Sequence, residues 1–172
     1  MRYLVAAGAP WGIECYLRHP DRGEWALATT PDGLRLGLEH TPRYVFCLNW
    51  SQKIAGPLVT RHTFVNFHCT DLPYGRGGGP LENLIRLGHT HTVITAHRMT
   101  NELDAGPVYG KWGPISLAGT KEQICQRFIG PCAALMRWMV EEEPEPTPQI
   151  GEPVLFQRLP KVEMRQIWEA RS

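Results

Sequence analysis

Short apolar runs separated by turn-forming residues divide the chain into pieces with the lengths of strands and helices. Several runs, such as residues 3–7 and 43–48, are apolar at nearly every position, which is typical of strands buried on both faces of a sheet. Residues 30–33, Thr-Pro-Asp-Gly, favour a turn, and they lie between two segments that we expect to be extended. The predicted strands and extended segments are residues 3–7, 24–28, 34–38, 43–48, 63–68, 92–99 and 107–115.

Helical patterns lie between these runs and after the last of them. Residues 120–123, Thr-Lys-Glu-Gln, have the form of a capping box at the start of a long helix. Pro131 lies inside this helix and should kink or split it, because its ring removes a backbone donor. The buried face of this helix is predicted to consist of Ile124, Phe128, Cys132, Leu135 and Met139. Shorter helices are expected at 12–17, at 51–59 with Ser51 as the cap and a break at Gly56-Pro57, and at 81–88 between Pro80 and Gly88.

The order of these elements predicts one α/β domain with a mostly parallel sheet flanked by helices. A chain of 172 residues, 42% hydrophobic and 20% charged, has the composition of an ordinary globular domain and can bury a core of its own. A proline-broken acidic connector occupies residues 141–148. We therefore expect the domain to span residues 1–149, with residues 150–172 as a C-terminal tail packed on it.

Charge and cysteine content exclude some classes of function. The net charge of +1 gives no electrostatic case for binding nucleic acid. The five cysteines are scattered, form no C-x-x-C motif and follow no signal peptide, which is typical of reduced thiols in a cytoplasmic protein. No apolar run has the length of a membrane span, so we expect no membrane association of that kind.

Two polar residues at the end of one apolar run are the first candidates for chemistry. Asn66 and His68 are two apart, so in a strand both side chains lie on the same face. Residues 73–80, rich in glycine and proline, cannot continue the strand and are expected to form a loop of exposed backbone. This loop lacks both the Lys-Ser/Thr of a Walker motif and the spacing of a dinucleotide-binding motif. In an open α/β sheet, the carboxyl ends of the strands are where such a site is built.

The same stretch resembles a known enzyme family, the formyltransferases that use N10-formyltetrahydrofolate. The resemblance covers about residues 43–116 and implies a shortened Rossmann-like formyltransferase fold, with fewer βα units than usual in its N-terminal half. It rests on two elements, Asn66-x-His68-x-x-x-Leu72-Pro73-x-x-Arg76-Gly77-x-x-Pro80 and, downstream, Leu103-Asp104-Ala105-Gly106, which is similar to the Leu-Asp-Thr-Gly element of that family.

The resemblance implies that Asn66, His68 and Asp104 are the catalytic residues. Formyl transfer to an amine requires an oxyanion to be stabilised, the amine to lose a proton and the folate nitrogen to gain one. A side-chain amide suits the oxyanion, and an imidazole can exchange a proton near neutral pH. We assign Asn66 to the oxyanion, His68 to the oxyanion and to proton transfer, and Asp104 to orienting His68 and accepting the amine proton.

The resemblance also implies where the two substrates bind. Trp50 either forms a wall for the pterin ring or covers the surface. N10-formyltetrahydrofolate is expected as the co-substrate, with no metal. The folate site is expected to include Asn49, Trp50, Ile54, Leu103 and Asp104, and the acceptor site Tyr74, Arg76, Gly77 and, in a basic tail like that of sugar-modifying members, Arg158.

Among acceptors, we favour a primary amine on a nucleotide-linked amino sugar. The low net charge counts against a tRNA acceptor, and so does the lack of room for the further C-terminal domain of the tRNA enzymes. The nearest alternatives are a formyltetrahydrofolate hydrolase and an enzyme that formylates a peptide or other natural product. Whether the chain forms a homodimer stays open.

Two alternatives do not involve formyl transfer. His89-x-His91, with His68, His97, Cys69 and Asp104 elsewhere in the chain, contains enough ligand types for zinc. These two turn histidines are more easily explained as solvated residues. A non-catalytic binding module is the other alternative, and it would predict the loss of a catalytic residue.

Overall fold

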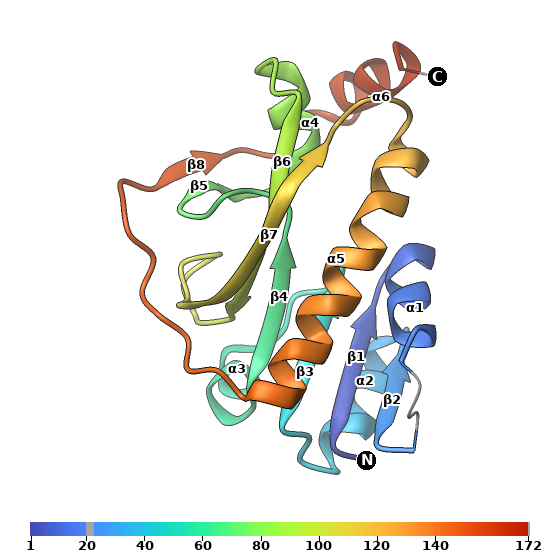
Figure 1. The fold of residues 1–172 in the computed structure, drawn as a ribbon, viewed down its shortest axis with the longest axis vertical. Helices are drawn as coiled ribbons and strands as arrows, with labels where there is room; N and C mark the ends of the chain where they lie inside the picture. The colour runs from blue at the N-terminus through green and yellow to red at the C-terminus, as the bar shows by residue number, and fades with distance from the viewer. Residues whose placement is uncertain (20–22, 172) are drawn as a thin grey trace.

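The computed structural model describes residues 1–19 and 23–171 and contains a central sheet of six strands among them (Figure 1). The first four strands pair in parallel, and β6 and β7 join through antiparallel pairings, β6 with β4 and β7 with β6, so the sheet is mostly parallel, as the sequence predicts. The order across the sheet is β2-β1-β3-β4-β6-β7. The bounds are β1 Tyr3–Ala7, β2 Trp25–Ala28, β3 Tyr44–Leu48, β4 Phe64–His68, β6 His91–Arg98 and β7 Val108–Ser116.

Helices cover the two faces of this sheet unequally. Helices α1 (Pro10–Leu17) and α5 (Lys121–Glu142) lie against one face, on the odd-numbered side chains of β1. The shorter α2 (Pro31–Leu38) and α3 (Gly56–Arg61) lie against the other face, on Leu4 and Ala6. The second face therefore has less helical cover than the first.

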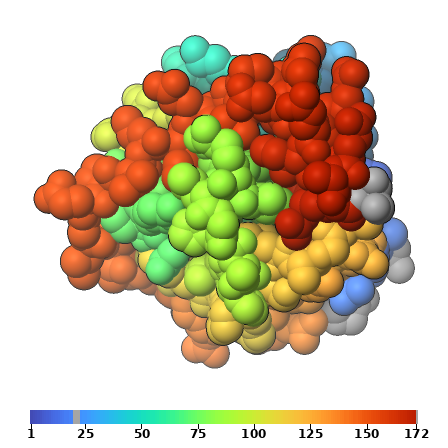
Figure 2. Space-filling model, turned by 90° about the horizontal axis from the view of Figure 1, so that it is seen from above, coloured from blue at the N-terminus to red at the C-terminus, as the bar shows by residue number. Residues whose placement is uncertain are grey.

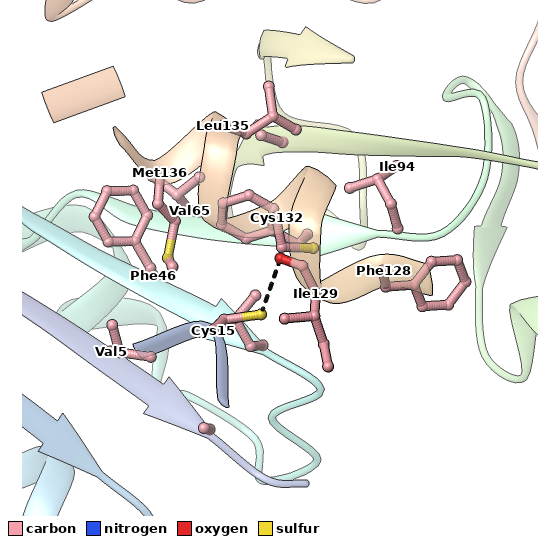
Figure 3. Packing of buried hydrophobic residues seen from close by; sticks show 14 of the residues in the cluster. Val5, Cys15, Phe46, Val65, Ile94, Phe128, Ile129, Cys132, Leu135 and Met136 are labelled. Atoms are coloured by element: carbon pink, nitrogen blue, oxygen red, sulfur yellow. Dashed lines mark hydrogen bonds between the residues drawn. The ribbon is translucent and has the colours of Figure 1, made fainter. Parts of the chain in front are cut away.

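The face under α1 and α5 holds the main hydrophobic core. Phe128, Cys132 and Met136 from α5 are almost fully buried against strand residues such as Val5 (Figure 3). The thiol of Cys15 in α1 donates to the Ile129 carbonyl oxygen at 3.6 Å. Burying a large apolar side chain contributes about 1.5–3 kcal/mol, so this face supplies much of the folding free energy.

A small two-stranded sheet and two helices complete the fold. Strand β5 (Tyr74–Gly77) pairs in parallel with β8 (Val154–Phe156), and α4 (Pro80–Arg86) follows β5. The C-terminal α6 (Lys161–Glu169) lies next to α4, where the Trp168 indole donates to buried Glu82 at 2.8 Å. Figure 2 shows this red C-terminal segment beside the green one that contains α4.

Most predicted strands are confirmed, but residues 34–38 are not extended. They belong to α2, which begins after Thr30, whose side chain accepts the Gly33 N–H at 3.1 Å. Pro31 occupies the first turn of that helix, where its missing N–H has no cost. Leu34 and Leu38 are four apart, so both lie on the buried face. The segment is therefore half of a βα unit rather than half of a hairpin.

Two other local predictions are wrong for a backbone reason, and a split of α5 at Pro131 does not occur. Residues 73–80 are not only loop, because β5 forms there; a Cβ on Gly77 (φ 106°) would overlap the Phe156 carbonyl oxygen. Helix α3 has Ala55 rather than Ser51 at its cap, and Gly56-Pro57 opens it instead of breaking it. Pro131 does not split α5, which continues from Lys121 to Glu142 after the predicted capping box at Thr120.

Of the helices in the described part of the chain, none combines the length and the apolar character that a membrane crossing needs.

Candidate active site

The candidate site begins with two neighbouring strands of opposite direction. Asn66 and His68 on β4 share the face of the sheet that carries α2 and α3, as period two requires. The antiparallel register places His97 of β6 opposite Asn66, and Thr95 opposite His68. Cross-strand partners lie on the same face, so the second histidine joins the two predicted residues.

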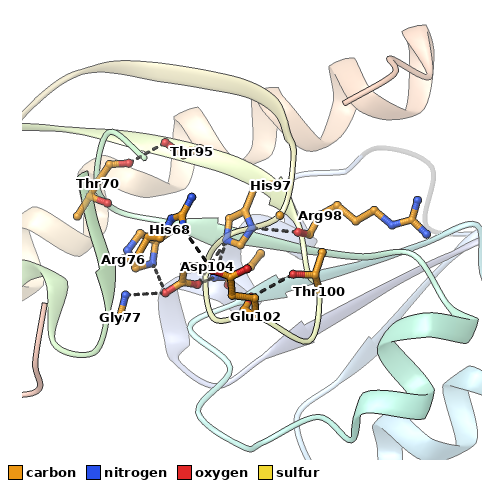
Figure 4. A network of polar contacts seen from close by, with 12 residues as sticks. His68, Thr70, Arg76, Gly77, Thr95, His97, Arg98, Thr100, Glu102 and Asp104 are labelled. Carbon is orange, nitrogen blue, oxygen red and sulfur yellow. Dashed lines mark hydrogen bonds and ion pairs between the residues drawn. The ribbon is translucent and has the colours of Figure 1, made fainter. Parts of the chain in front are cut away.

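The loop after β6 brings Asp104 onto this face (Figure 4). Its Oδ2 accepts the Gly77 N–H at 2.9 Å and lies 3.7 Å from His68 Nδ1. Its Oδ1 lies 3.5 Å from His97 Nε2 and accepts from the Asn66 side-chain amide at 3.4 Å. The structure thus brings Asn66, His68 and Asp104 together, across 38 positions of sequence.

The backbone at Asp104 is left-handed, with φ of 51°. Aspartate tolerates this conformation better than most residues other than glycine and asparagine. The side chain of Gln149, just after the connector at residues 141–148, holds the loop by donating to the carbonyl oxygens of Asp104 (2.8 Å) and Gly106 (2.9 Å). The conformation that aims the carboxylate at His68 is therefore supported from outside the loop.

Electrostatics favour an ionised Asp104. Burial raises the pKa of this carboxyl group, but the hydrogen bond with His97, the nearby His68 and the Gly77 N–H outweigh burial and lower the pKa to about 2. At neutral pH the carboxylate is negatively charged and can attract a proton to an imidazole next to it.

His68 is held in one tautomer. Its Nε2 lies 2.7 Å from the Gly75 carbonyl oxygen, which can only accept, so Nε2 carries a hydrogen. The atom free to take up a second proton is therefore Nδ1, which faces Asp104. Burial lowers the pKa of His68, while Asp104 and the Gly75 carbonyl act in the opposite direction. A neutral imidazole beside a carboxylate is a suitable proton acceptor.

Arg76, predicted to bind the acceptor, already has a protein partner. Its Nε and Nη2 donate to Gln149 Oε1 at 3.0 and 2.8 Å, and its Nη1 lies 3.6 Å from exposed Glu102. Gly77 uses its N–H for Asp104. Both residues lie at the site, and in this structure both support the Asp104 loop.

The residues predicted to bind folate occupy two adjacent loops. Trp50 and Ile54, after β3, are half-buried against the cluster under α2 and α3. The Trp50 Nε1 is buried and has no hydrogen-bond partner among the described residues. Asn49 is left-handed with φ of 52° and exposed, and Leu103 is 70% exposed. The start of α3 touches the Asp104 loop, since a Cβ on Gly56 would lie 2.9 Å from Asn101 Oδ1.

The residues predicted for the acceptor are more spread out. The Tyr74 hydroxyl lies 2.9 Å from His89 Nε2, and both residues line a cavity of about 350 Å³ together with Asp71 and His91. Arg158, in the segment after β8, is exposed and lies beside Gly78. Among residues 1–19 and 23–171, no group of three or more His, Cys, Asp or Glu is arranged to hold a metal ion.

Two residues of the site, His97 and Gln149, have roles that the sequence does not predict. His97 figured only as a metal ligand, yet it is 1% exposed and contacts Asp104 and Asn66. Its position opposite Asn66 on the neighbouring strand could be recognised only with the strand register known. Gln149 directly follows the connector at residues 141–148, in no motif, and no sequence signal distinguishes it.

No protein-family model matches the chain. A curated methionyl-tRNA formyltransferase from Cutibacterium acnes is 33% identical over 100 residues, which cover 56% of this chain and 32% of that protein. The match thus spans about a third of the length of the curated relative. A solved methionyl-tRNA formyltransferase from Clostridium thermocellum is 30% identical, with a TM-score of 0.86 over 93% of this chain and 73% of that one.

A more distant structure has the same fold. The N-formyltransferase from Helicobacter canadensis, solved with folinic acid and dTDP-3-aminofucose, has a TM-score of 0.68 and 14% identity over 92% of this chain and 71% of that chain.

The fold and the site together define an α/β domain in which Asn66 and His68, at the end of a parallel strand, meet Asp104 from the loop after β6. The chain belongs to the formyltransferase family.

Proposed function

We propose that this protein transfers the formyl group of N10-formyltetrahydrofolate to a primary amine. The observation that carries the proposal is the convergence of Asn66, His68 and Asp104, with Asp104 Oδ2 3.7 Å from His68 Nδ1 and Oδ1 3.4 Å from the Asn66 amide. These are an oxyanion donor, a proton-transfer group and a carboxylate within one small volume.

The reaction can be assigned to these groups step by step. The amine lone pair forms a bond to the formyl carbon, and the carbonyl electron pair moves to its oxygen, which the Asn66 amide and His68 would stabilise. The amine gives up one proton to the Asp104–His68 pair. The electron pair of the oxyanion then re-forms the C=O bond while the C–N10 bond breaks with its electron pair on the folate nitrogen, which takes up a proton, and a formamide and tetrahydrofolate leave.

The loop at residues 49–55 is the proposed wall for the folate. Trp50 and Ile54 offer apolar surface on the same face as Asn66, and the Trp50 N–H is a donor that no group in residues 1–19 or 23–171 accepts. A pterin ring combines a flat apolar face with hydrogen-bond acceptors, so it fits this donor set. The Helicobacter canadensis neighbour, which binds folinic acid, supports a reduced folate as the co-substrate.

For the acceptor, we propose a nucleotide-linked amino sugar. The net charge of +1 supports a small acceptor over a nucleic acid, and the complex of the Helicobacter canadensis enzyme with dTDP-3-aminofucose supports this class. A second candidate, methionyl-tRNA, has its own support, because the relatives at 30% identity or more act on it by name.

Turnover of N10-formyltetrahydrofolate against a panel of acceptors tests the proposal. The panel contains nucleotide-linked amino sugars and methionyl-tRNA, and absorbance and mass spectrometry follow donor and product. We expect folate turnover that depends on an amino sugar, with a product heavier by one formyl group. Formylation of methionyl-tRNA alone would select the second candidate. Turnover without any amine would favour the hydrolase, and no turnover with no folate binding would contradict formyl transfer.

A further inference from the structure

The loop between β4 and β5 returns to the histidine that precedes it. His68 is the last residue of β4, and the carbonyl oxygen of Gly75, seven positions later, lies 2.7 Å from His68 Nε2. This contact fixes the hydrogen and the orientation of the imidazole, because a carbonyl oxygen accepts from a limited range of directions. Whatever holds the Gly75 carbonyl therefore also determines where His68 Nδ1 points.

Thr70 holds this carbonyl from within the loop. It is fully buried, and its hydroxyl donates to the Gly75 carbonyl oxygen at 3.4 Å. Gly75 is left-handed, with φ of 77°, and a Cβ added to it would lie 2.7 Å from the Thr70 methyl carbon. The Gly75 oxygen thus has two donors, His68 Nε2 and the Thr70 hydroxyl, one for each of its lone pairs.

Thr95 on β6 in turn holds Thr70. Thr95 is also fully buried, and its hydroxyl donates to the Thr70 carbonyl oxygen at 2.7 Å (Figure 4). The antiparallel register places Thr95 directly opposite His68. The side chain that anchors the loop therefore lies next to the imidazole that the loop contacts.

A second threonine of the same strand allows an internal comparison. Thr92 is buried, and its hydroxyl donates to the Cys69 carbonyl oxygen at 2.6 Å. Thr92 and Thr95 are three apart in a strand, so their side chains lie on opposite faces of the sheet. Thr92 therefore anchors the start of the same loop, but from the face opposite to His68.

We propose that Thr95 and Thr70 are positioning residues of this site, which set the orientation of the His68 imidazole through a backbone carbonyl. The Thr95 hydroxyl fixes the Thr70 carbonyl, and the Thr70 hydroxyl fixes the carbonyl of Gly75. That carbonyl keeps the imidazole hydrogen on Nε2, so that Nδ1 faces Asp104. The part of this inference that concerns kcat rests on the proposed formyl transfer, whereas the part that concerns the ring does not.

Four variants separate positioning from a general loss of stability. Valine resembles threonine in shape and lacks the hydroxyl, so Thr95→Val and Thr70→Val each remove one link of the chain of contacts. Thr95→Ser keeps the hydroxyl. Thr92→Val is the matched control, because it removes a hydrogen bond of the same kind between the same strand and the same loop. Thr92→Val and Thr95→Val should therefore lower the urea midpoint of unfolding by similar amounts.

The first measurement is NMR of the His68 ring in the full chain labelled with 15N, which requires no substrate. In the wild type, Thr92→Val and Thr95→Ser, we expect a slowly exchanging Nε2–H signal. In Thr95→Val and Thr70→Val, this hydrogen should exchange with solvent about tenfold faster, the effect of one lost hydrogen bond. Equal exchange in Thr95→Val and the wild type would overturn the proposal, and so would an equally large change in Thr92→Val.

The second measurement is steady-state formyl transfer by the same variants. We expect kcat of Thr95→Val to fall about tenfold, with the KM for the folate changed less than about threefold, because the ring and not the folate site is displaced. Thr95→Ser should recover most of this loss, and Thr92→Val should stay within about twofold of the wild type. A kcat of Thr95→Val equal to that of Thr92→Val would overturn the role in catalysis.

The two measurements fail separately. If the wild type transfers no formyl group, the proposed function is wrong, and the NMR comparison alone decides whether Thr95 and Thr70 position His68. If Thr95→Val does not fold, Thr70→Val takes its place in both measurements, with the same expected results.

Discussion

The two faces of the central sheet show how one scaffold serves stability and chemistry separately. The face under α1 and α5 is apolar throughout and dominated by side chains such as Phe128 and Met136. On the other face, α2 and α3 cover only part of the sheet. Over β4 and β6, loops and the β5–β8 pair take the place of a helix, and they bring the Gly75 carbonyl oxygen to His68 and the Gly77 N–H to Asp104.

This difference teaches where a polar site can be built. A helix presents side chains to a sheet and keeps its own backbone groups paired, so it favours apolar packing. A loop or a short strand presents free N–H and C=O groups, such as Gly77 N and Gly75 O. Buried titratable side chains need such partners, and they occur on the face that lacks a long helix.

The largest effect should come from the face that carries Asn66 and His68, which loops cover over β4 and β6 and which we call the loop-covered face. His68→Ala should lower kcat by about 100- to 10,000-fold, the range for removing a proton-transfer group, with little change in the free energy of unfolding. Steady-state kinetics and urea unfolding check the two parts. A variant with more than a tenth of wild-type kcat would refute the assignment of His68.

The reverse pattern is expected on the face under α1 and α5, which we call the helix-covered face. Phe128→Ala should reduce the free energy of unfolding by about 3–5 kcal/mol, because it removes a fully buried ring and leaves a cavity. At a temperature where the variant is folded, its kcat should stay within about twofold of the wild type. Equal damage to kcat and to stability would show that the two faces are not independent.

Acid should act on the loop-covered face through Asp104. The pKa of Asp104 is lowered to about 2 in the folded protein. Its contribution to the free energy of unfolding is therefore fully present above the ordinary pKa near 3.8 and is lost as pH falls toward 2. That contribution is on the order of 2 kcal/mol. Urea unfolding between pH 6 and pH 2 should show a steeper loss for the wild type than for Asp104→Asn. Parallel curves would contradict the low pKa.

Gln149→Ala should have an intermediate effect. Gln149 accepts from Arg76 and donates to the carbonyl oxygens of Asp104 and Gly106. The substitution removes this bridge, so the Asp104 loop loses its outside support. We expect kcat to fall about tenfold, the equivalent of about 1.4 kcal/mol. Gln157→Ala, an exposed glutamine further along the same segment, is the control. An unchanged kcat in Gln149→Ala would show that the loop holds its own shape.

The smallest effect is expected at the N-terminus of α2. Thr30→Ala removes the side chain that accepts the Gly33 N–H and should cost about 1 kcal/mol of unfolding free energy, with no effect on kcat. Thr30→Ser should retain the cap. An unchanged free energy of unfolding in Thr30→Ala would indicate that packing alone holds α2 against the sheet.

Much of the apolar framework could be predicted from local patterns. Buried strands such as β1 and β3 are continuous apolar runs, and α5 has a capping box with a regular apolar face. Residues 30–38 were mistaken because Thr-Pro-Asp-Gly suits both a turn and a helix start. The eight-residue helix is too short for its period to decide between them.

The site was only partly predictable for a different reason. Asn66, His68 and Asp104 lie in motifs, so the family resemblance locates them. His97 and Gln149 act through long-range contacts, with partners that depend on strand register and on the return of the connector. β5 also depends on a distant partner, because β8 lies about 80 residues later in the chain. Such pairings leave no local pattern in the sequence.

The most direct test of formyl transfer is to follow the carbon itself. N10-formyltetrahydrofolate labelled with 13C in the formyl group is incubated with the protein and the acceptor panel, and the products are analysed by mass spectrometry and 13C NMR. The account predicts labelled formamide on an acceptor amine and an equal amount of tetrahydrofolate with the wild type, and almost none with His68→Ala. Label that stays on the folate, or appears only as free formate, would contradict transfer to an amine.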